Sequence, residues 1–386
     1  MRPLHPLRDL NEQLLRRRTS IKWREYPSDV LPLWVAEMDV LPPAAVTGAL
    51  VAAIEAGDTG YPHGNEYAEA FAAFAADRWG WHGLDPGRTA YAADVMTGVS
   101  EAVRLVSGPG DPVVVNPPVY PPFFGFTEHA GRVVVAAPLG DDGRLELDGL
   151  DRAFGQAGAG GRRVTYLLCN PHNPTAVTHT RDELLAVASL ARRHGVRVVV
   201  DEIHGPLVPT GFVPYLSLDG TEDAFVVTSA SKAFNLAGAK AAVIVAGEAA
   251  AADLEQLPEI VSHGPSHLGM IAHTAALREG SAWLDAVHAD LADNRRLLAD
   301  LLAEHLPAVR WGGGSATYLA WLDCRDLGLG DDPAAAFLAG GKVALNSGLP
   351  FGIGGAGHVR LNFATSPTIL GDAIGRMAEV VRAHRD

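Results

Sequence analysis

Residues 164–204 read VTYLLCNPHNPTAVTHTRDELLAVASLARRHGVRVVVDEIH, and this stretch holds two short apolar runs on either side of a helical segment. The runs VTYLL (164–168) and VRVVV (196–200) do not alternate apolar with polar residues, so each is expected to be a strand buried on both faces. Between them, Arg181–His194 has the pattern of a helix. A buried strand, a helix and a second buried strand predict two parallel strands joined by a crossover helix.

The same alternation of strands and helices continues on both sides of this stretch. Four more β-branched runs occur, PVVV (112–115), RVVVAA (132–137), AFVVT (224–228) and AAVIVA (241–246). Apolar strands that alternate with helices are typical of a mostly parallel sheet covered by helices on both faces. The sequence therefore predicts a large three-layer α/β domain.

The residues before this domain have a different pattern. Helical periodicity covers residues 7–18, 44–57 and 66–79, and a proline-punctuated extended stretch covers residues 23–43. We expect residues 1–43 to form an N-terminal arm rather than a part of the large domain.

A second, smaller domain is expected at the C-terminal end. Residues 281–305 are a long helical stretch without glycine or proline, which indicates a connecting helix. TYLAWLD (317–323) and HVRLNF (358–363) follow it as candidate strands of an α+β unit. The sequence thus predicts a large domain at 44–280 and a small C-terminal domain at 281–386.

The composition argues against several classes of protein. The 386 residues include 31 basic and 45 acidic ones, for a net charge of −14, and no long basic tract is present to neutralise nucleic-acid phosphates. No apolar run reaches the roughly 18 residues that span a bilayer, and the first 20 residues lack the apolar core of a secretory signal. Two cysteines cannot form a disulfide framework. We therefore expect a soluble protein of the cytoplasm.

Lysine is unusually scarce in this chain. Only four of the 31 basic residues are lysines, namely Lys22, Lys232, Lys240 and Lys342. An arginine stays protonated, whereas a lysine amine can lose its proton and act as a nucleophile. A lysine in a special position of this chain is therefore a candidate for chemistry.

Reactive and polar side chains follow four of the expected strands. In open α/β sheets, ligands bind beyond the carboxyl ends of the strands. The strand exits supply an aromatic ring, an amide, a carboxylate and one of the rare lysines: Tyr120, Asn173, Asp201 and Lys232. Residues 97–100 are expected to open a helix, whose N–H groups and dipole favour an anion.

Pyridoxal phosphate is a ligand that would use all five features. Its aldehyde needs a lysine amine, its ring nitrogen needs a carboxylate, and its phenolate oxygen needs a hydrogen-bond donor. Its ring face suits an aromatic side chain, and its phosphate suits a helix N-terminus. The strand exits therefore predict a pyridoxal phosphate site.

Eight segments carry a resemblance to a known family. They span nearly the whole chain: KWREYP (22–27), LPLWVAEMDV (31–40), GYPHGN (60–65), NPPVYPPF (116–123), NPHNPT (170–175), DEIHGPLV (201–208), SKAFNLAG (231–238) and HVRLNFA (358–364). With these segments the chain resembles fold-type I pyridoxal-phosphate enzymes, the aspartate-aminotransferase-like class. More narrowly, it resembles the cystathionine β-lyases of the PatB/MalY type. The resemblance implies that the N-terminal arm contributes to the small domain and to the active site.

The resemblance implies a role for each matching residue. Lys232 forms the Schiff-base linkage to the cofactor and moves the Cα proton of the substrate. Asp201 pairs with the pyridinium nitrogen, and Tyr120 stacks on the ring and counts among the catalytic residues. Asn173 donates to the phenolate oxygen, and it also lies beside the substrate. Arg360 clamps the substrate carboxylate, a task that suits the fork of a guanidinium.

The phosphate site and the assembly follow from the same resemblance. Gly98, Val99 and Ser100 are expected to hold the phosphate together with Ser229. Tyr61 is expected to reach the phosphate bound by a neighbouring subunit. A site built from two chains requires a homodimer as the minimum unit.

The chain departs from the family pattern at three positions. Ala176 stands where the family usually has glycine, and Ala233 stands where it often has threonine. Lys240 replaces an arginine of the aspartate aminotransferases and a neutral residue of the β-lyases. We count Lys240 as an additional phosphate contact.

Each of these residues also has a possible structural role. Lys232 and Arg360 could be solvated surface residues, and Asp201 and Asn173 could serve as a cap and a turn residue. Tyr120 could be a core aromatic only. A metal site built on His172 and His204 is a weak alternative, because the cofactor already explains their location. Trp34, Glu37 and Asp39 in the arm either line the substrate site or only pack it.

The predicted reaction is carbon–sulfur β-elimination. The enzyme would cleave L-cystathionine or a related cysteine S-conjugate to a thiol, which is homocysteine for cystathionine, with pyruvate and ammonia. An aminotransferase needs the same residues and stays open as an alternative, as does a non-catalytic regulatory protein on this fold. The natural sulfur amino acid does not follow from the sequence.

Overall fold

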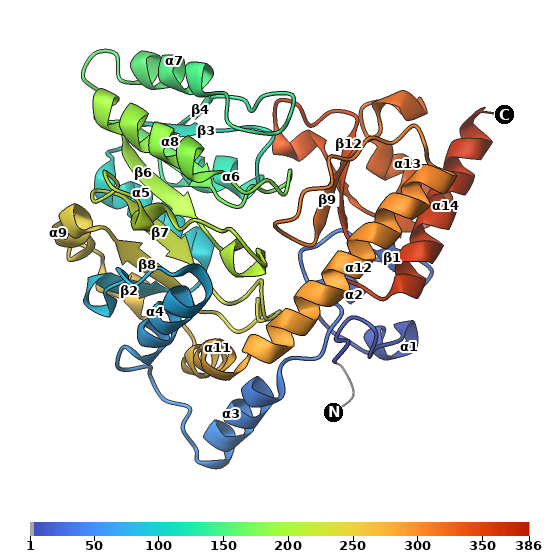
Figure 1. Ribbon diagram of the computed structural model, residues 1–386, viewed down its shortest axis with the longest axis horizontal. Helices are drawn as coiled ribbons and strands as arrows, with labels where there is room; N and C mark the ends of the chain where they lie inside the picture. Colours follow the sequence, from blue (N-terminus) through green and yellow to red (C-terminus); the bar gives the residue numbers. More distant parts are fainter. Residues whose placement is uncertain (1–3, 386) are drawn as a thin grey trace. The chain divides into compact units, whose positions relative to one another are not determined.

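The computed structural model describes residues 4–385 and divides the chain into two units (Figure 1). One unit comprises the described residues up to Leu41, the short segment 173–176, and the chain from Ala282 onward. The other unit comprises residues 42–172 and 177–281. We call them the small unit and the large unit. Segment 173–176 belongs to the small unit although the residues before and after it belong to the large unit. The predicted division into consecutive ranges does not include this exchange.

A seven-stranded sheet forms the centre of the large unit, with the strand order β2-β8-β7-β6-β5-β3-β4. The strands are β2 (Thr89–Ala92), β3 (Pro112–Val115), β4 (Val133–Ala136), β5 (Thr165–Cys169), β6 (Arg197–Asp201), β7 (Phe225–Thr228) and β8 (Ala242–Ala246). Strands β3 to β7 run parallel to one another, whereas β8 is antiparallel to both β7 and β2. This confirms the mostly parallel sheet, and β2 is a strand that the sequence pattern did not predict.

Helices surround this sheet. They are α3 (Ala44–Glu55), α4 (Glu66–Trp79), α5 (Val95–Val106), α6 (Pro122–His129), α7 (Leu147–Ala157), α8 (Arg181–His194), α9 (Ala251–Leu254), α10 (Glu259–Ser262) and α11 (His267–Glu279). Short 3-10 helices occur at Pro86–Arg88, Gly205–Leu207, Tyr215–Ser217 and Glu248–Ala250. Helix α8 matches its predicted bounds, because Thr180 and Glu183 form a capping box at its start and Gly195 ends it with a left-handed backbone.

The two faces of the sheet are both covered. Leu167 and Cys169 of β5 belong to a core cluster that includes the apolar side of α5. Tyr166, which points to the opposite face because strand residues alternate, packs its ring 5.3 Å from that of Phe154 in α7. Figure 1 shows α7 and α8 together on the near side of the sheet. The three-layer arrangement predicted from the unbroken apolar runs is therefore present.

The small unit contains two small sheets and three long helices. Strands β9 (Leu319–Asp323), β11 (Asn346–Ser347) and β12 (His358–Asn362) form an antiparallel sheet with β12 in the middle. Strand β1 (Leu31–Pro32) pairs with β10 (Val343–Ala344). The helices are α12 (Ser281–His305), α13 (Pro333–Gly341) and α14 (Pro367–Arg385), with the four-residue helices α1 (Glu12–Leu15) and α2 (Ile21–Arg24) in the arm. Arg325–Leu327 and Leu349–Phe351 are 3-10 helices.

The arm contains less helix than the sequence pattern predicted. A helix over 7–18 was expected, but only Glu12–Leu15 is α-helical. The side chain of Asn11 caps this helix by accepting the N–H of Leu14, so the helix begins after an extended residue rather than continuing from Leu7. The connecting helix α12, by contrast, has the predicted bounds. Within residues 4–385 no helix is both long and apolar enough to cross a bilayer.

Candidate active site

The predicted residues of the large unit follow the ends of parallel strands. Asp201 is the last residue of β6, and Ser229 directly follows β7. Tyr120 lies five residues after the end of β3. Since parallel strands share a direction, their carboxyl ends meet at one edge of the sheet. This is the edge where the sequence predicts the cofactor.

Asp201 is a buried carboxylate beside a lysine. Its side chain is 4% exposed, and its Oδ1 accepts the N–H of Ile203 at 3.0 Å. Burial raises the pKa of Asp201 to about 6, while the Ile203 N–H and the positive charge of Lys232 oppose this rise. The two charged groups are therefore within electrostatic reach of each other. A carboxylate in such a place favours a cationic partner, which a protonated pyridinium would provide.

Glu202 is a second buried carboxyl group, to which the sequence assigned no role. It is 2% exposed, and its Oε1 accepts the N–H of Tyr215 at 2.7 Å. Burial raises the pKa of Glu202 to about 8, and the negative charge of Asp201 acts in the same direction. Glu202 is therefore mostly protonated at neutral pH, which leaves Asp201 to carry the negative charge at this strand end.

Lys232 lies in a loop built from successive turns, which we call the lysine loop (residues 229–240). Its backbone bonds include Phe234 N–H to the carbonyl of Ala230 at 3.0 Å and Leu236 N–H to the carbonyl of Ser231 at 2.8 Å. Lys232 itself is half-buried. The loop therefore holds the lysine in a defined position rather than on a mobile stretch of surface.

Helix α5 begins at Val95, two residues before the expected start. Asp94 caps it, because its Oδ1 accepts both the N–H and the hydroxyl of Thr97 at 2.9 Å. Lys240 donates to the other oxygen of Asp94 at 2.7 Å. Burial alone would raise the pKa of Asp94, but the Lys240 and Thr97 hydrogen bonds bring it below its usual value. The phosphate contact of Lys240 stays a prediction, and the structure pairs this amine with Asp94.

Gly98, Val99 and Ser100 lie in the first two turns of α5. A Cβ on Gly98 would come within 2.7 Å of Val227 Cγ1 and 3.2 Å of Ile244 Cγ1, so this glycine lets the helix approach the sheet closely. The hydroxyl of Ser100 is buried and has no hydrogen-bond partner among residues 4–385. An anion at this helix end would satisfy such a group.

The two predicted tyrosines differ in their surroundings. The ring of Tyr120 is half-buried against the core cluster and lies 6.1 Å from that of Phe123, edge to face. Tyr61 is 92% exposed, in the stretch between α3 and α4. Stacking by Tyr120 and the contact of Tyr61 with a neighbouring subunit stay predictions.

Arg360 and Asn173 form a buried pair in the small unit. Arg360 on β12 is 4% exposed, which rules out the alternative of a solvent-facing arginine. Its Nη1 donates to Asn173 Oδ1 at 3.0 Å, and its Nη2 donates to the carbonyl of Trp34 at 3.3 Å. The guanidinium carbon lies 5.2 Å from the ring centre of Phe351. Because the oxygen of Asn173 accepts from Arg360, its Nδ2 is the end that can donate to a ligand.

Side chains hold the carbonyls of four consecutive arm residues, 34–37. The donors are Arg360 to Trp34 at 3.3 Å, Asn362 to Val35 at 2.7 Å and to Glu37 at 2.6 Å, Tyr318 to Ala36 at 3.0 Å, and Lys22 to Glu37 at 3.0 Å. This stretch of backbone is therefore fixed to the rest of the small unit. No local sequence signal marks these contacts, because the donors are up to 327 residues away along the chain.

Asp39 and Trp34 have different local contacts. Asp39 is 2% exposed, and its two oxygens accept from Lys22 Nζ and Trp23 Nε1, each at 2.8 Å. These contacts favour the packing alternative for Asp39, and its substrate-binding role stays a prediction. Trp34 packs edge-on against Tyr26 at 5.8 Å, and its indole N–H is buried without an acceptor among residues 4–385.

The two histidines of the weak metal hypothesis are both buried. His172 is 1% and His204 3% exposed, and burial lowers the pKa of His172 to about 3. Across the described part of the chain, no three histidine, cysteine, aspartate or glutamate side chains gather in a way that could hold a metal ion.

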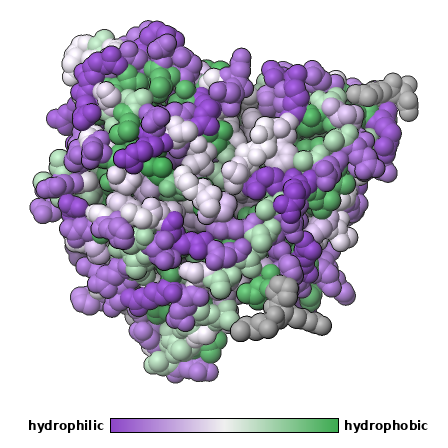
Figure 2. Space-filling model, in the orientation of Figure 1, coloured by the Kyte–Doolittle hydropathy of each residue, from purple (hydrophilic) through white to green (hydrophobic). Residues whose placement is uncertain are grey.

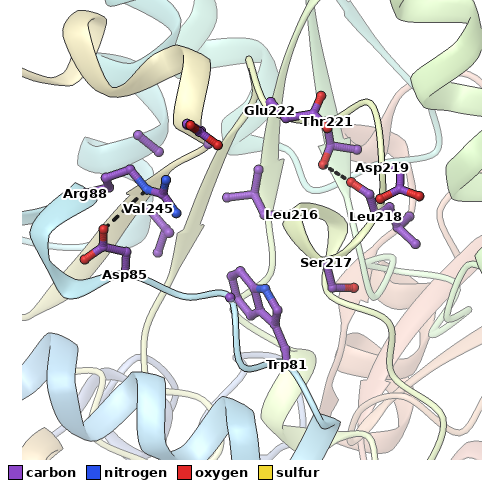
Figure 3. Close-up of a pocket in the computed structure, with 14 residues that line it drawn as sticks. Trp81, Asp85, Arg88, Leu216, Ser217, Leu218, Asp219, Thr221, Glu222 and Val245 are labelled. Atoms are coloured by element: carbon purple, nitrogen blue, oxygen red, sulfur yellow. Dashed lines mark hydrogen bonds and ion pairs between the residues drawn. The ribbon is translucent and has the colours of Figure 1, made fainter.

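A cavity of about 210 Å³ lies elsewhere in the large unit (Figure 3). It is lined by residues next to the start of β2, the end of β8 and the start of β7, including Arg88, Glu222 and Gly247. These strand ends are at the edge opposite to Asp201 and Ser229. Figure 3 shows the Asp85–Arg88 pair on one side of the cavity and Ser217 with Asp219 on the other. None of the predicted site residues lines it.

Comparison with known proteins defines the class of the chain. Residues 28–376 match the family Aminotransferase class I and II. A crystal structure from Corynebacterium diphtheriae, described as a "putative plp-dependent beta-cystathionase", superposes with a TM-score of 0.91 at 35% identity, covering 97% of this chain and 99% of that one. The chain therefore belongs to the aminotransferase class I and II family.

The branch within this family follows from the sequence relatives. A Mycobacterium tuberculosis protein named "Putative cystathionine beta-lyase" is 55% identical, covering 99% of each chain. Cystathionine beta-lyase PatB of Bacillus subtilis is 35% identical, covering 93% of this chain and 95% of PatB. The predicted resemblance to the PatB/MalY-type cystathionine β-lyases is thus confirmed.

Proposed function

We propose that this protein is a pyridoxal-phosphate-dependent carbon–sulfur β-lyase. It cleaves L-cystathionine or a related cysteine S-conjugate to a thiol, pyruvate and ammonia. The observation that carries this conclusion is the 55% identity, over 99% of each chain, with a protein named as a cystathionine β-lyase. The buried Asp201 beside Lys232 at the carboxyl edge of the sheet is the arrangement that this chemistry needs.

The residues of the large unit fit pyridoxal phosphate on two observations. Asp201 is a buried carboxylate whose raised pKa calls for a cation, and the hydroxyl of Ser100 is buried without a partner among residues 4–385. Lys232 would hold the cofactor covalently, Asp201 would hold its ring nitrogen, and Tyr120 would cover the ring. Gly98, Val99, Ser100 and Ser229 would hold the phosphate, with Lys240 as an additional cation. When bound, the cofactor supplies the electron sink for the reaction.

Lys232 is the residue proposed to move protons. Its amine, once it carries a lone pair, accepts the proton from the substrate Cα and can return it elsewhere. Asp201 stays ionised above its pKa of about 6 and would favour a positive charge on the ring nitrogen of the cofactor. Glu202, with its pKa of about 8, adds little negative charge at neutral pH.

Arg360 is proposed to bind the substrate α-carboxylate. Its guanidinium is held in one orientation by Asn173, the Trp34 carbonyl and the ring of Phe351. A fixed guanidinium can offer two parallel N–H donors to a carboxylate. Asn173, whose oxygen accepts from Arg360, is proposed to donate its Nδ2 to the phenolate oxygen of the cofactor.

The sulfur of the substrate explains why elimination wins over transamination. A thiol has a pKa of about 8.5, so its thiolate leaves Cβ more readily than a hydroxide would. The enzyme needs only to align the Cβ–S bond and to keep Lys232 from returning the proton to the cofactor. An aminotransferase would use the same residues, and the family that the chain matches contains such enzymes by name.

We further propose a homodimer. Helix α3 has the sequence AAVTGALVAAIE, yet only Val46 and Ala53 in it are buried. Val51 and Ile54 are 47% and 59% exposed, and Tyr61 nearby in the sequence is 92% exposed. Figure 2 shows hydrophobic colouring over α3, at the lower end of the view. A second copy of the chain would cover this apolar surface and bring Tyr61 to the partner's phosphate.

A cytoplasmic location is also proposed. Cys169 and Cys324 are both buried and unbridged. Thiols that are not joined in a disulfide are typical of a reducing compartment.

A panel of cysteine S-conjugates tests the proposed reaction. The purified protein with pyridoxal phosphate is incubated with each conjugate, and pyruvate and free thiol are measured together. Equal amounts of pyruvate and thiol from cystathionine or a close relative are expected. If no conjugate yields pyruvate or thiol, the result would contradict the lyase assignment and favour the non-catalytic alternative.

A further inference from the structure

A tyrosine and a histidine that the reaction does not use lie against the lysine loop. Tyr67 of α4 and His273 of α11 are both 0% exposed. The hydroxyl of Tyr67 lies 3.1 Å from Nδ1 of His273, and the rings pack edge to face with centres 5.4 Å apart. The N–H of Ala230, two residues before Lys232, donates to the Tyr67 hydroxyl at 3.3 Å.

His273 also faces the far end of the same loop. The backbone of Leu236 and Ala239 raises the pKa of His273 against the effect of burial, and Nε2 of the ring has no hydrogen-bond partner among residues 4–385. Helix α11, which carries His273, is docked on the loop end, because the N–H of Ser266 donates to the carbonyl of Lys240 at 2.8 Å. A Cβ on Gly269 would lie 2.9 Å from that carbonyl oxygen, so the glycine permits this close approach.

Tyr67 and His273 are both uncharged at neutral pH. Burial lowers the pKa of His273 to about 4 and raises that of Tyr67 to about 12, so both are neutral at pH 7. A neutral imidazole has one N–H and one acceptor nitrogen. The polar contacts of His273 are made by Nδ1, which lies 3.1 Å from the Tyr67 hydroxyl and 3.4 Å from the Ser229 hydroxyl. A connected set of polar contacts therefore runs from the N–H of Ala230 through Tyr67 and His273 to Ser229.

Ser229 adds a third fixed point at the start of the loop. Its hydroxyl donates to the carbonyl of Ala241 at 2.7 Å and accepts the N–H of Ser231 at 3.1 Å. The same oxygen lies 3.4 Å from Nδ1 of His273. The residues on both sides of Lys232 are therefore attached to a buried polar cluster whose members come from α4, α11 and the loop itself.

We propose that Tyr67 and His273 are positioning residues that hold the lysine loop, and with it the Lys232 amine, in place for bond formation with the cofactor aldehyde. This inference rests on the proposed role of Lys232. Neither residue needs to touch the cofactor, since Tyr67 accepts the N–H of Ala230 and His273 lies against Tyr67 and Ser229, directly before the lysine. The bond-forming step joins the amine nitrogen to the aldehyde carbon and releases one water, so its rate depends on where the amine is held.

Tyr67→Phe is the variant that isolates this effect. It keeps the ring but leaves the buried N–H of Ala230 without its acceptor and removes the Tyr67 contact of His273 Nδ1. The loop can recover these bonds only by shifting, which moves Lys232. Losing one hydrogen bond of this kind changes an equilibrium constant or a rate by about 3- to 10-fold.

Tyr91→Phe is the matched control. Tyr91 stacks on Tyr67 with ring centres 6.0 Å apart, and its hydroxyl also accepts a backbone N–H, that of Ala68, at 3.3 Å. Its hydroxyl therefore resembles that of Tyr67 in kind but bonds to helix α4 instead of the lysine loop. Any general loss of stability from removing a tyrosine hydroxyl in this cluster therefore appears in both Tyr67→Phe and Tyr91→Phe.

Two histidine variants test which ring nitrogen of His273 is needed. His273→Asn keeps an amide near the position of Nδ1, and His273→Gln keeps one near Nε2. Each is expected to slow bond formation, but less than His273→Ala does. If Tyr67→Phe does not fold, the His273 variants provide the test instead.

The experiment adds pyridoxal phosphate to cofactor-free protein and follows the covalent step by absorbance, at cofactor concentrations where its rate no longer rises. Borohydride then reduces the carbon–nitrogen double bond and fixes the linkage for mass spectrometry. Tyr67→Phe should slow the covalent step about 3- to 10-fold relative to Tyr91→Phe, while the two cofactor-free proteins melt within a few degrees of each other. Equal covalent rates in the two variants would overturn the inference and leave the role of Lys232 intact. A linkage that still forms in Lys232→Ala would overturn both.

Discussion

Removing the Arg360 side chain is the sharpest perturbation of the small unit. Arg360 is 4% exposed and holds three groups at once, namely Asn173, the carbonyl of Trp34 and the ring of Phe351. If this guanidinium binds the substrate carboxylate, Arg360→Ala leaves that carboxylate without its cation. The same change removes the hydrogen bond that sets the direction of the Asn173 amide.

The expected size follows from the burial of the group. Truncating one member of a buried charged pair costs about 2–5 kcal/mol, which is about 30-fold to several-thousand-fold in binding. The effect should appear in kcat/KM for amino-acid substrates. Arg360→Lys keeps the charge but presents a point donor instead of a fork, so its loss should be smaller than that of alanine.

The assay compares kcat/KM for cystathionine in wild type, Arg360→Ala, Arg360→Lys and the control Arg310→Ala. Arg310 lies in the same unit but is 61% exposed and pairs with Asp323 on the surface. Exposed pairs contribute about 0–1 kcal/mol, so this control should stay close to wild type. The absorbance of the bound cofactor confirms that each variant still holds it. Unchanged kcat/KM in Arg360→Ala would place the carboxylate site elsewhere and refute the reasoning.

Four further predictions concern the large unit. Burial raises the pKa of Glu202 from 4.5 to about 8 in the folded protein, so the folded state holds a proton that the unfolded chain has released. The contribution of Glu202 to the unfolding free energy of cofactor-free protein should therefore fall as the pH rises from about 4.5 to 8, by about 1.4 kcal/mol for each pH unit. Buried neutral histidines such as His172 and His273 act in the opposite direction below about pH 6.5, so the comparison is made between two proteins. Measured by urea, the unfolding free energy of wild type minus that of Glu202→Gln should fall over this pH range, and a difference that does not change with pH would contradict this. Gly98→Ala puts a methyl group 2.7 Å from Val227 Cγ1, so a loss of about 1–3 kcal/mol is expected in the same assay; wild-type stability would show that α5 can move away. Ile54→Glu should shift light scattering from dimer to monomer if the exposed face of α3 is the interface, and Tyr61→Phe should weaken cofactor retention without changing the fold; a dimer that tolerates Ile54→Glu would move the interface.

The sequence predicts the large unit well because its signals are local. The apolar runs over residues 164–168 and 196–200 correspond to β5 and β6 within one residue. An unbroken apolar run identifies a strand buried on both faces even when its neighbouring strands are not known. Strand β2 was missed because Thr89–Ala92 is short and only partly buried. The start of α5 was placed two residues late because Asp94, rather than a residue near Thr97, provides the cap.

The site was predicted less completely because the contacts that support it are non-local. Asp201 and Lys232 are recognisable from strand exits and from the scarcity of lysine. Tyr67 and His273, by contrast, are 206 residues apart and sit in ordinary helical patterns. The bond between Arg360 and Asn173 joins positions 187 residues apart. Contacts of this kind depend on how the elements pack, which a single sequence does not display.

The central claim is that the protein eliminates a thiolate instead of transferring an amino group. Wild-type protein with pyridoxal phosphate is given L-cystathionine and 2-oxoglutarate in one reaction, and pyruvate, homocysteine and glutamate are measured over time. We expect pyruvate and homocysteine in equal amounts, with glutamate as a minor product. Glutamate formed well ahead of pyruvate would contradict the β-lyase assignment and establish the aminotransferase in its place.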